Sequence, residues 1–284
     1  MTTARKLEQL LFDAYPAKDA IPDDRIGLLV GDATAEVRGI ALALDAKVAN
    51  IEAAFAAGCN VLVSHHPVFW YPPTEFLRQG LSEGAAVYRA AELGVALIAM
   101  HTNLDCAPET KGLLLEPAGF TYSAPLSLPR ETEAELRVAK KTADTSEERA
   151  KTPELTPSMG QMGVPKDGKP VSLQQVASLY KNAFGAVAKV WGSPEKVIGQ
   201  LACCSGGGGS LVQRVINLGA DCYVTGEVAY HEALTLADAD VALIELGHDR
   251  SELPYREHLY KTLLAAGIDE SLLHILGPTA SWWQ

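Results

Sequence analysis

Residues 56–66, AAGCNVLVSHH, decide the fold class of this chain. The stretch begins as the glycine-containing end of a helical pattern, continues as the apolar run of a buried strand, and ends on two adjacent histidines. Residues 217–227, NLGADCYVTGE, repeat this order: a helix end with Gly, a small residue, a strand and then a change to polar residues. Strands that follow helices in this way are typical of an α/β protein.

The rest of the chain continues the alternation of strand and helix. The expected strands are 39–45, 60–66, 95–101, 200–206, 221–227 and 241–248, and the helical patterns are 47–57, 83–93, 172–184, 210–218, 228–237 and 255–266. Several of the strands are continuously apolar, as strands covered on both faces tend to be. The sequence therefore predicts an α/β fold with mixed, largely parallel sheets.

A second pair of matching stretches indicates an internal duplication. GVALIAMHTNLD (94–105) resembles DVALIELGHDRSE (240–252), because each ends a VALI strand with a histidine and an acid four residues later. Together with the first pair, in the same order, this predicts two similar α/β domains.

Residues 129–170 break the alternation, since they are first highly charged and then rich in Pro, Gly and Met. This composition favours a solvated connection or an inter-domain hairpin. We therefore expect a discontinuous first domain of residues 1–128 and 240–284. The second domain is then 129–239, including the connecting segment 129–170.

Composition limits the partners of the protein. The 284 residues carry 24 basic and 35 acidic side chains, a net charge of −11, without a Lys/Arg cluster, so direct binding of nucleic acid is not expected. Five cysteines, an odd number without a CxxC pair, argue against a disulfide framework or a Cys-rich zinc site. No apolar run is long enough for a membrane span and the start does not resemble a signal peptide, so we expect a cytoplasmic protein without a membrane partner.

Histidines and acids follow the ends of three expected strands, where α/β proteins place their sites. They are His65 and His66, His101 with Asp105, and His248 with Glu252. Imidazole with carboxylate is the ligand set of Zn, Mn, Fe or Ni rather than of Ca or Mg. A carboxylate can also bridge two cations, so the set favours a two-metal site. Each of these signals alone also fits a structural role without a metal, either a hydrogen-bonded histidine at a strand end or an HxxxE pair on an amphipathic helix.

Other polar features leave two interpretations open. CSGGGGS (204–210) either holds a phosphate or makes a tight turn that needs positive φ. Asp45 either orients a histidine or caps the helix at 47–57, and the cap is the preferred interpretation. Glu227 and His231, at helical i, i+4 spacing, either line the site or form a surface pair.

Six short motifs, in one order over nearly the whole chain, resemble those of a single family. They are GLLVG (27–31), ALD (43–45), VSHHP (63–67), HTNLD (101–105), TGE (225–227) and GH followed by Ser-Glu (247–252). The sequence resembles the NGG-one-interacting-factor-three-like family, also called GTP cyclohydrolase one type two homologues. This resemblance implies two similar α/β domains, a ring-shaped homohexamer and a dinuclear metal centre. The metal ligands that it implies are His65, His66, Asp105, His248 and Glu252.

Two divalent ions would polarise a carbonyl or phosphoryl oxygen and lower the pKa of water, which predicts a dinuclear metal-dependent hydrolase. Its substrate is a small molecule, with nucleotides and other phosphate-containing compounds as candidates. His101 and His231 are candidates for proton transfer or substrate contact. The alternative is a non-enzymatic adaptor, regulatory or metal-trafficking protein. A third, weaker alternative is a nucleotide-binding module that uses CSGGGGS.

Overall fold

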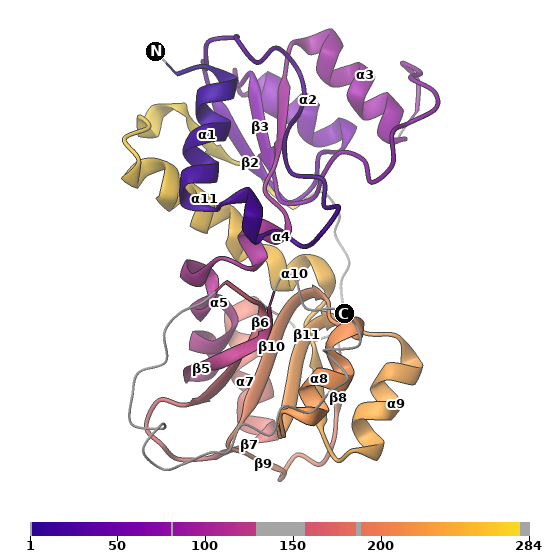
Figure 1. The fold of residues 1–284 in the computed structure, drawn as a ribbon, viewed down its shortest axis with the longest axis vertical. Helices are drawn as coiled ribbons and strands as arrows, with labels where there is room; N and C mark the ends of the chain where they lie inside the picture. The colour runs from indigo at the N-terminus through magenta and orange to yellow at the C-terminus, as the bar shows by residue number, and fades with distance from the viewer. Residues whose placement is uncertain (1, 81, 129–156, 186–188, 279–284) are drawn as a thin grey trace. The chain divides into compact units, whose positions relative to one another are not determined.

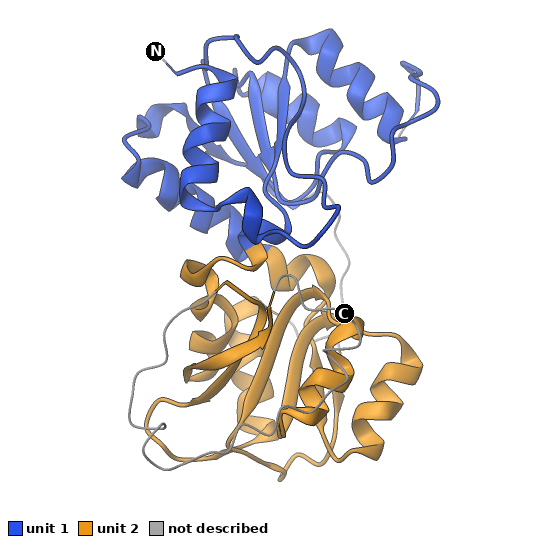
Figure 2. Ribbon diagram, viewed as in Figure 1, with its two compact units in different colours: residues 1–104, 253–283 blue, residues 105–252, 284 orange. Residues whose placement is uncertain are grey.

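The structure, a computed structural model, describes residues 2–80, 82–128, 157–185 and 189–278. The chain forms two compact units (Figure 2): unit 1 contains residues 1–104 and 253–283, and unit 2 contains residues 105–252 and 284. Each unit has its own mixed sheet with helices, so the predicted α/β class with two similar domains is confirmed.

Unit 1 is built on a five-stranded sheet of order β1-β4-β3-β2-β13 (Figure 1). Its strands are β1 (Gly27–Val30), β2 (Ile40–Ala43), β3 (Val61–Ser64), β4 (Ala96–Ala99) and β13 (Leu273–Ile275). The last four run parallel, and β1 pairs antiparallel with β4. Strands β2, β3 and β4 are buried on both faces, which explains their continuous apolar sequence.

The helices of unit 1 cover this sheet. They are α1 (Ala4–Ala14), α2 (Val48–Ala56), α3 (Glu83–Leu93), α11 (Pro254–Ala265) and the short η1 (Ala17–Asp19) and η6 (Glu270–Leu272). Ile51 and Ala54 of α2 and Ala86 and Ala90 of α3 pack in one cluster with Leu62 of β3. Helix α11 contacts β2 and β13, so the C-terminal segment belongs to unit 1. The chain leaves unit 1 in the single turn α4 (Thr102–Asp105).

Unit 2 is built on a six-stranded sheet of order β5-β6-β10-β11-β12-β8. Its strands are β5 (Phe120–Ser127), β6 (Met159–Pro165), β8 (Lys189–Trp191), β10 (Leu201–Gly207), β11 (Cys222–Glu227) and β12 (Ala242–Glu245). Strands β10, β11 and β12 are parallel, and the other three each pair antiparallel with a neighbour. A separate pair joins β7 (Val171–Ser172) to β9 (Val197–Ile198).

Helices cover both faces of the second sheet. They are α5 (Gly112–Leu115), α7 (Leu173–Phe184), α8 (Val212–Asn217), α9 (Tyr230–Asp238) and α10 (His248–Glu252), with η2 (Pro108–Thr110), η3 (Glu116–Ala118) and η5 (Gly209–Leu211). Leu115 and Tyr180 pack with Cys203 on one face, while Val215 of α8 and Leu236 of α9 pack with Tyr223 on the other.

The two sheets share one topology. In each, three consecutive parallel strands lie side by side, and the third pairs with an antiparallel strand from earlier in that unit: β1 in unit 1 and β8 in unit 2. The connections match as well, since α2 and α3 link the parallel strands of unit 1 as α8 and α9 link those of unit 2. The duplication that the paired stretches predict is therefore present in the fold.

All six predicted strands and all six predicted helices form close to their expected positions. The unit boundaries differ from the expected 1–128/240–284 and 129–239. Residues 120–127 belong to unit 2 because β5 pairs with β6, and residues 242–245 belong there because β12 pairs with β11.

The segment 129–170 is expected to be a solvated connection or an inter-domain hairpin. Its residues 129–156 lie outside the described part, and residues 159–165 form the mostly buried strand β6, which pairs antiparallel with β5 within unit 2. Within the described residues no helix has the length and apolar character that crossing a membrane requires.

Candidate metal centre

Three histidines gather at one edge of the sheet of unit 1. His65 and His66 directly follow β3, and His101 follows the neighbouring strand β4 two residues after its end. Because parallel neighbours end at the same edge, the three rings meet there, with centroids 5.1–5.9 Å apart. One ligand atom from each lies within 4.8 Å of the other two. Neighbouring side chains within a strand point to opposite faces of the sheet. Because β3 ends at Ser64, this alternation does not apply to His65 and His66.

Each of these rings is anchored through Nδ1. His65 Nδ1 lies 3.0 Å from the carbonyl oxygen of Met100. His66 Nδ1 lies 3.0 Å from Asp45 Oδ1, and His101 Nδ1 lies 2.8 Å from Asp24 Oδ1. A carbonyl or carboxylate only accepts, so the proton of the neutral ring sits on Nδ1. Nε2 then presents its lone pair, as in metal sites where an acceptor orients each histidine.

Asp45 therefore takes the role of orienting a histidine, and the preferred interpretation as a helix cap is wrong. The N-cap of α2 is Lys47, without a side-chain hydrogen bond. Asp45 Oδ1 contacts His66, and the Asp45 carbonyl accepts from Asn50 Nδ2 at 2.8 Å. The carboxylate lies just beyond β2, the strand next to β3, which brings it to the same edge as the histidines.

Asp24 is a functional candidate that the sequence analysis missed. Its carboxylate accepts from the Thr102 N–H at 3.0 Å and from the Thr102 hydroxyl, in addition to facing His101. Burial by itself raises the pKa of Asp24, but the hydrogen bond and charge of His101 and the bonds from Thr102 outweigh it and lower the pKa to about 2. Asp24 is therefore a fixed anion behind His101. It lies in an irregular loop, and no periodicity or motif singles it out.

Unit 2 brings together an imidazole and two carboxylates. Glu252 Oε1 lies 3.3 Å from His248 Nε2, one turn away on α10, and one ligand atom of Asp105 lies within 4.8 Å of one of Glu252. His248 Nδ1 lies 2.9 Å from Glu227 Oε1, so its proton also faces an acceptor. Nε2 and a carboxylate oxygen are then two acceptors at 3.3 Å, an arrangement that a cation or a proton between them stabilises. Glu252 is only 4% exposed, which raises the cost of leaving its charge uncompensated.

Asp105 is held from three directions within unit 2. Ser205 Oγ donates to Asp105 Oδ1 at 2.9 Å. The Asp105 carbonyl accepts from Lys111 Nζ and from Thr110 Oγ1, both at 3.4 Å. Lys111 also donates to the carbonyl of Ser158, and burial lowers its pKa to about 8. These contacts fix the position of the Asp105 backbone and one of its carboxylate oxygens.

The glycines of CSGGGGS pack against this group. Gly206 has φ +62°, and a Cβ there would lie 2.3 Å from Glu252 Oε1 and 3.3 Å from His248 Nε2. The Gly206 N–H donates to Ser251 Oγ at 2.9 Å, and the Gly208 N–H donates to the Glu227 carbonyl at 3.0 Å. These two N–H groups already donate to groups of the protein, which supports the tight-turn interpretation over phosphate binding. The α-helix that follows, α8, has only six residues.

The other residues singled out in the sequence have plainer surroundings. His231 is exposed on α9, where its ring contacts Tyr230, and it belongs to none of the metal-binding groups found among the described residues. Glu227 is exposed but contacts His248. Of the Glu227–His231 pair, only Glu227 therefore lies beside the His248–Glu252 group, and His231 lies away from it. The five cysteines, all within the described residues, are buried and form no disulfide.

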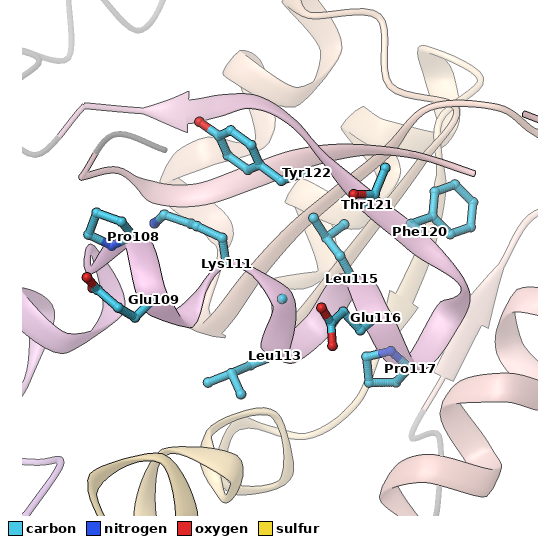
Figure 3. A pocket seen from close by; sticks show the side chains of 11 residues that line it. Pro108, Glu109, Lys111, Leu113, Leu115, Glu116, Pro117, Phe120, Thr121 and Tyr122 are labelled. Atoms are coloured by element: carbon cyan, nitrogen blue, oxygen red, sulfur yellow. The ribbon is translucent and has the colours of Figure 1, made fainter. Parts of the chain in front are cut away.

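A pocket of about 780 Å³ also lies in unit 2, lined by residues of η2, α5, η3 and β5 (Figure 3). Lys111 and Glu109 lie toward one end of it, and Glu116 and Pro117 toward the other. Its walls are mixed, with the apolar Leu113, Leu115 and Phe120 beside the charged groups. None of the residues expected to bind metal lines this pocket.

The fold and its histidine-rich groups define a class: a duplicated α/β protein with side chains that could hold a metal ion. The sequence pattern of the Duf34/NIF3 (NGG1p interacting factor 3) family matches residues 2–275. The chain is 33% identical over 252 residues to a GTP cyclohydrolase 1 type 2 homolog of Chlamydia muridarum, covering 86% of each protein. A homolog of the same name from Clostridium acetobutylicum is 25% identical over 256 residues, covering 89% of this chain and 84% of the relative. The chain belongs to the Duf34/NIF3 family.

Solved structures share the fold. Staphylococcus aureus protein SA1388 matches with a TM-score of 0.78 at 24% identity, covering 100% of this chain and 99% of that one. Reduced HcgD from Methanocaldococcus jannaschii matches with a TM-score of 0.73 at 21% identity, covering 96% and 97%. At these identities the likeness concerns the fold alone.

Proposed function

We propose that the protein is a metal-dependent hydrolase whose centre holds two divalent transition-metal ions. The ligands we assign are His65, His66, Asp105, His248 and Glu252. The observation that carries the proposal is the anchoring of the imidazoles. Each of the three ligand histidines has Nδ1 against an oxygen acceptor, which selects the tautomer that binds a metal through Nε2.

The donor set also fits the proposed ions. Imidazole nitrogens with carboxylate oxygens suit Zn, Mn, Fe or Ni, while Ca and Mg prefer oxygen alone. The closeness of the buried Glu252 carboxylate to Asp105 supports a cation there, since two carboxylates repel unless a positive charge lies between them.

The two proposed carboxylate ligands lie at the ends of unit 2 along the chain. Asp105 is the first residue of unit 2, and Glu252 is the last residue of unit 2 before the chain returns to unit 1. The proposed carboxylate ligands are therefore the residues at the two chain crossings, each joined covalently to the other unit.

The bound metals would supply a Lewis acid for a carbonyl or phosphoryl oxygen and would lower the pKa of water toward neutrality. We propose a small substrate of the nucleotide or phosphate-containing kind, in line with the name of the curated relatives. His231, exposed on α9, is a candidate for substrate contact or proton transfer. His101, whose Nδ1 faces Asp24, is the second candidate for this role.

A turnover screen tests the proposal. The protein is loaded in turn with Zn²⁺, Mn²⁺, Fe²⁺ and Ni²⁺ and offered GTP and other nucleotides, phosphoesters and cyclic amides. We expect hydrolysis of at least one class that requires the metal and is lost in Asp105→Ala, while His274→Ala, a histidine of β13 outside the metal-binding groups, keeps it.

A different result would favour the non-enzymatic alternative. If protein carrying two ions turns over no substrate, and Asp105→Ala changes only metal content or assembly, the metal-binding adaptor or trafficking function replaces the hydrolase.

A further inference from the structure

We propose that Trp70 and Arg25 recognise the substrate in unit 1. The indole of Trp70 stacks on a planar ring and the guanidinium of Arg25 binds an anionic group, so the substrate is an aromatic anion of the nucleotide class. The inference rests on the proposed function in that it names recognition residues for the same site. Neither residue is among the proposed metal ligands.

Trp70 is a large apolar side chain that remains 47% exposed beside the histidines of unit 1. Its ring meets the ring of His101 at a centroid distance of 5.0 Å and an interplanar angle of 71°. The ring of His101 lies in turn 5.2 Å from that of His65. An exposed aromatic ring is a platform on which any planar base can stack. A base stacked on this indole therefore lies close to His101, a candidate for substrate contact or proton transfer.

The segment that carries the indole is anchored. Val68 is 5% exposed and belongs to the hydrophobic cluster that α2 and α3 form with the sheet, and Phe69 packs against the same cluster. Pro67, Pro72 and Pro73 fix φ at their own positions and restrict the residue before each of them. Because the segment is held in this way, stacking a ring on the indole requires little further ordering of the chain.

Arg25 supplies positive charge at the same place. Its Nε donates to the carbonyl oxygen of Trp70 at 3.2 Å, and its backbone N–H donates to Asp24 Oδ1 at 2.8 Å. Among the described residues, the terminal nitrogens of Arg25 form no hydrogen bond or ion pair, and the side chain is exposed. A guanidinium that is held at Nε and open at its terminal nitrogens suits a phosphate or carboxylate group.

The sheet explains why two residues 45 positions apart meet at this edge. Strand β1 is antiparallel to β4 and begins at Gly27, opposite Ala99 at the end of β4. The loop before β1, which carries Arg25, therefore lies at the edge where β3 and β4 end, and the loop after β3 carries Trp70. In a chain with a net charge of −11, a cation at this edge attracts an anionic substrate.

Three probes separate the two contacts. AMP carries a planar base and a phosphate, adenosine carries the base alone, and ribose 5-phosphate carries the phosphate alone. Titration calorimetry measures the affinity of Zn²⁺-loaded wild type, Trp70→Ala, Trp70→Phe and Arg25→Gln for each probe. Zn²⁺ content and circular dichroism verify that each variant is loaded and folded.

Phe55→Ala and Arg38→Gln are the matched controls. Phe55 is 52% exposed near the end of α2, and Arg38 is exposed just before the start of β2. Both residues therefore lie at the edge of the sheet opposite the histidines, because α2 leads from the end of β2 back to the start of β3.

We expect Trp70→Ala to weaken AMP and adenosine binding roughly 5–150-fold, which is the effect of losing one base–aromatic stack, and to leave ribose 5-phosphate unchanged. Trp70→Phe should recover part of this loss because it keeps a ring. Arg25→Gln should weaken AMP and ribose 5-phosphate binding roughly 10–100-fold, as the loss of a charge-assisted hydrogen bond does, and leave adenosine unchanged. Both controls should bind all three probes as the wild type does.

An AMP affinity that neither Trp70→Ala nor Arg25→Gln changes would overturn the inference. An equal loss for all three probes would also overturn it, because it marks a structural effect, and so would a loaded wild type that binds none of them. The proposed function fails in another way: these selective losses of binding, without metal-dependent turnover of any substrate, would contradict the hydrolase and leave the recognition residues in place.

Discussion

The two units present the same strand–histidine–helix element with different surroundings. In unit 1 His101 is backed by Asp24, whose side chain is 1% exposed, whereas in unit 2 His248 is backed by Glu227, which is 62% exposed. At the end of the middle parallel strand, unit 1 places His65 and His66, directly after β3, and unit 2 places Glu227, the last residue of β11. One topology thus carries an imidazole-rich group in one copy and a carboxylate-rich group in the other.

The two groups also differ in the charge that they offer to a metal ion. Three imidazoles are neutral donors when they bind a metal, while Asp105 and Glu252 supply two negative charges. The proposed centre, with both kinds of donor, would partly neutralise two divalent ions and keep positive charge available for an anionic substrate. In a protein with a net charge of −11, that local positive charge is the natural attraction for such a substrate.

The largest effect expected from a single change comes from removing an imidazole of unit 1. In His66→Ala, metal affinity should fall by more than about 100-fold, because loss of a residue that only orients a ligand already costs roughly 10–100-fold. Competition with a chromophoric chelator measures this. His274→Ala is the matched control, and equal affinity in the two variants would remove His66 from the site.

The two carboxylates behind His101 and His248 should differ in their effect. Asp24→Asn should lower metal affinity by roughly 10–100-fold, because the buried anion orients His101 in an environment with little screening. Glu227→Gln should change it only a few-fold, since water screens an exposed carboxylate. Titration calorimetry measures the metal affinity of both variants, and a larger loss of affinity in Glu227→Gln than in Asp24→Asn would contradict this expectation.

The buried Asp24 also predicts a pH dependence in unit 1. Its pKa is lowered from 3.8 to about 2 in the folded protein, so its stabilisation is complete above the unfolded value and disappears as pH falls through the folded one. In metal-free protein, the difference in unfolding free energy between wild type and Asp24→Asn should shrink by up to about 2 kcal/mol between pH 4 and pH 2. Urea unfolding at a series of pH values measures it, and a constant difference would contradict the assignment.

The smallest effect concerns the glycine under the group of unit 2. Gly206→Ala should cost about 1–2 kcal/mol of stability from its positive φ and should lower metal affinity roughly 10-fold, because the added Cβ displaces Glu252. Gly219→Ala, with φ +71° and open space around the new Cβ, should cost similar stability and leave affinity unchanged. Thermal unfolding and metal titration of both variants test this pair. Equal metal affinities would show that Gly206 has no role in positioning Glu252.

Much of this arrangement could be predicted from the sequence because it depends on local pattern. Apolar runs identified the parallel strands, and the histidines stand directly at their ends, so sheet geometry alone places His65, His66 and His101 at one edge. The paired VALI stretches predicted the duplication, which the matching strand orders confirm.

The rest depends on contacts between distant residues. Asp24 is 77 residues from His101 and lies in an irregular loop, so only the folded chain shows their pairing. The interpretation of Asp45 as a helix cap is wrong because its carboxylate contacts His66, which is 21 residues away in the sequence. The unit boundaries depend on antiparallel pairing of β5 with β6, two strands without a clear alternating pattern.

The central claim is that the histidine groups bind two metal ions, and anomalous scattering from crystals grown without added metal tests it most directly. Data collected on both sides of the Zn, Fe, Mn and Ni absorption edges identify each ion while locating it. We predict two anomalous peaks in the region of His65 and His66. Fewer than two ions in the region of His65, in crystals of protein that analyses as metal-loaded, would contradict the account.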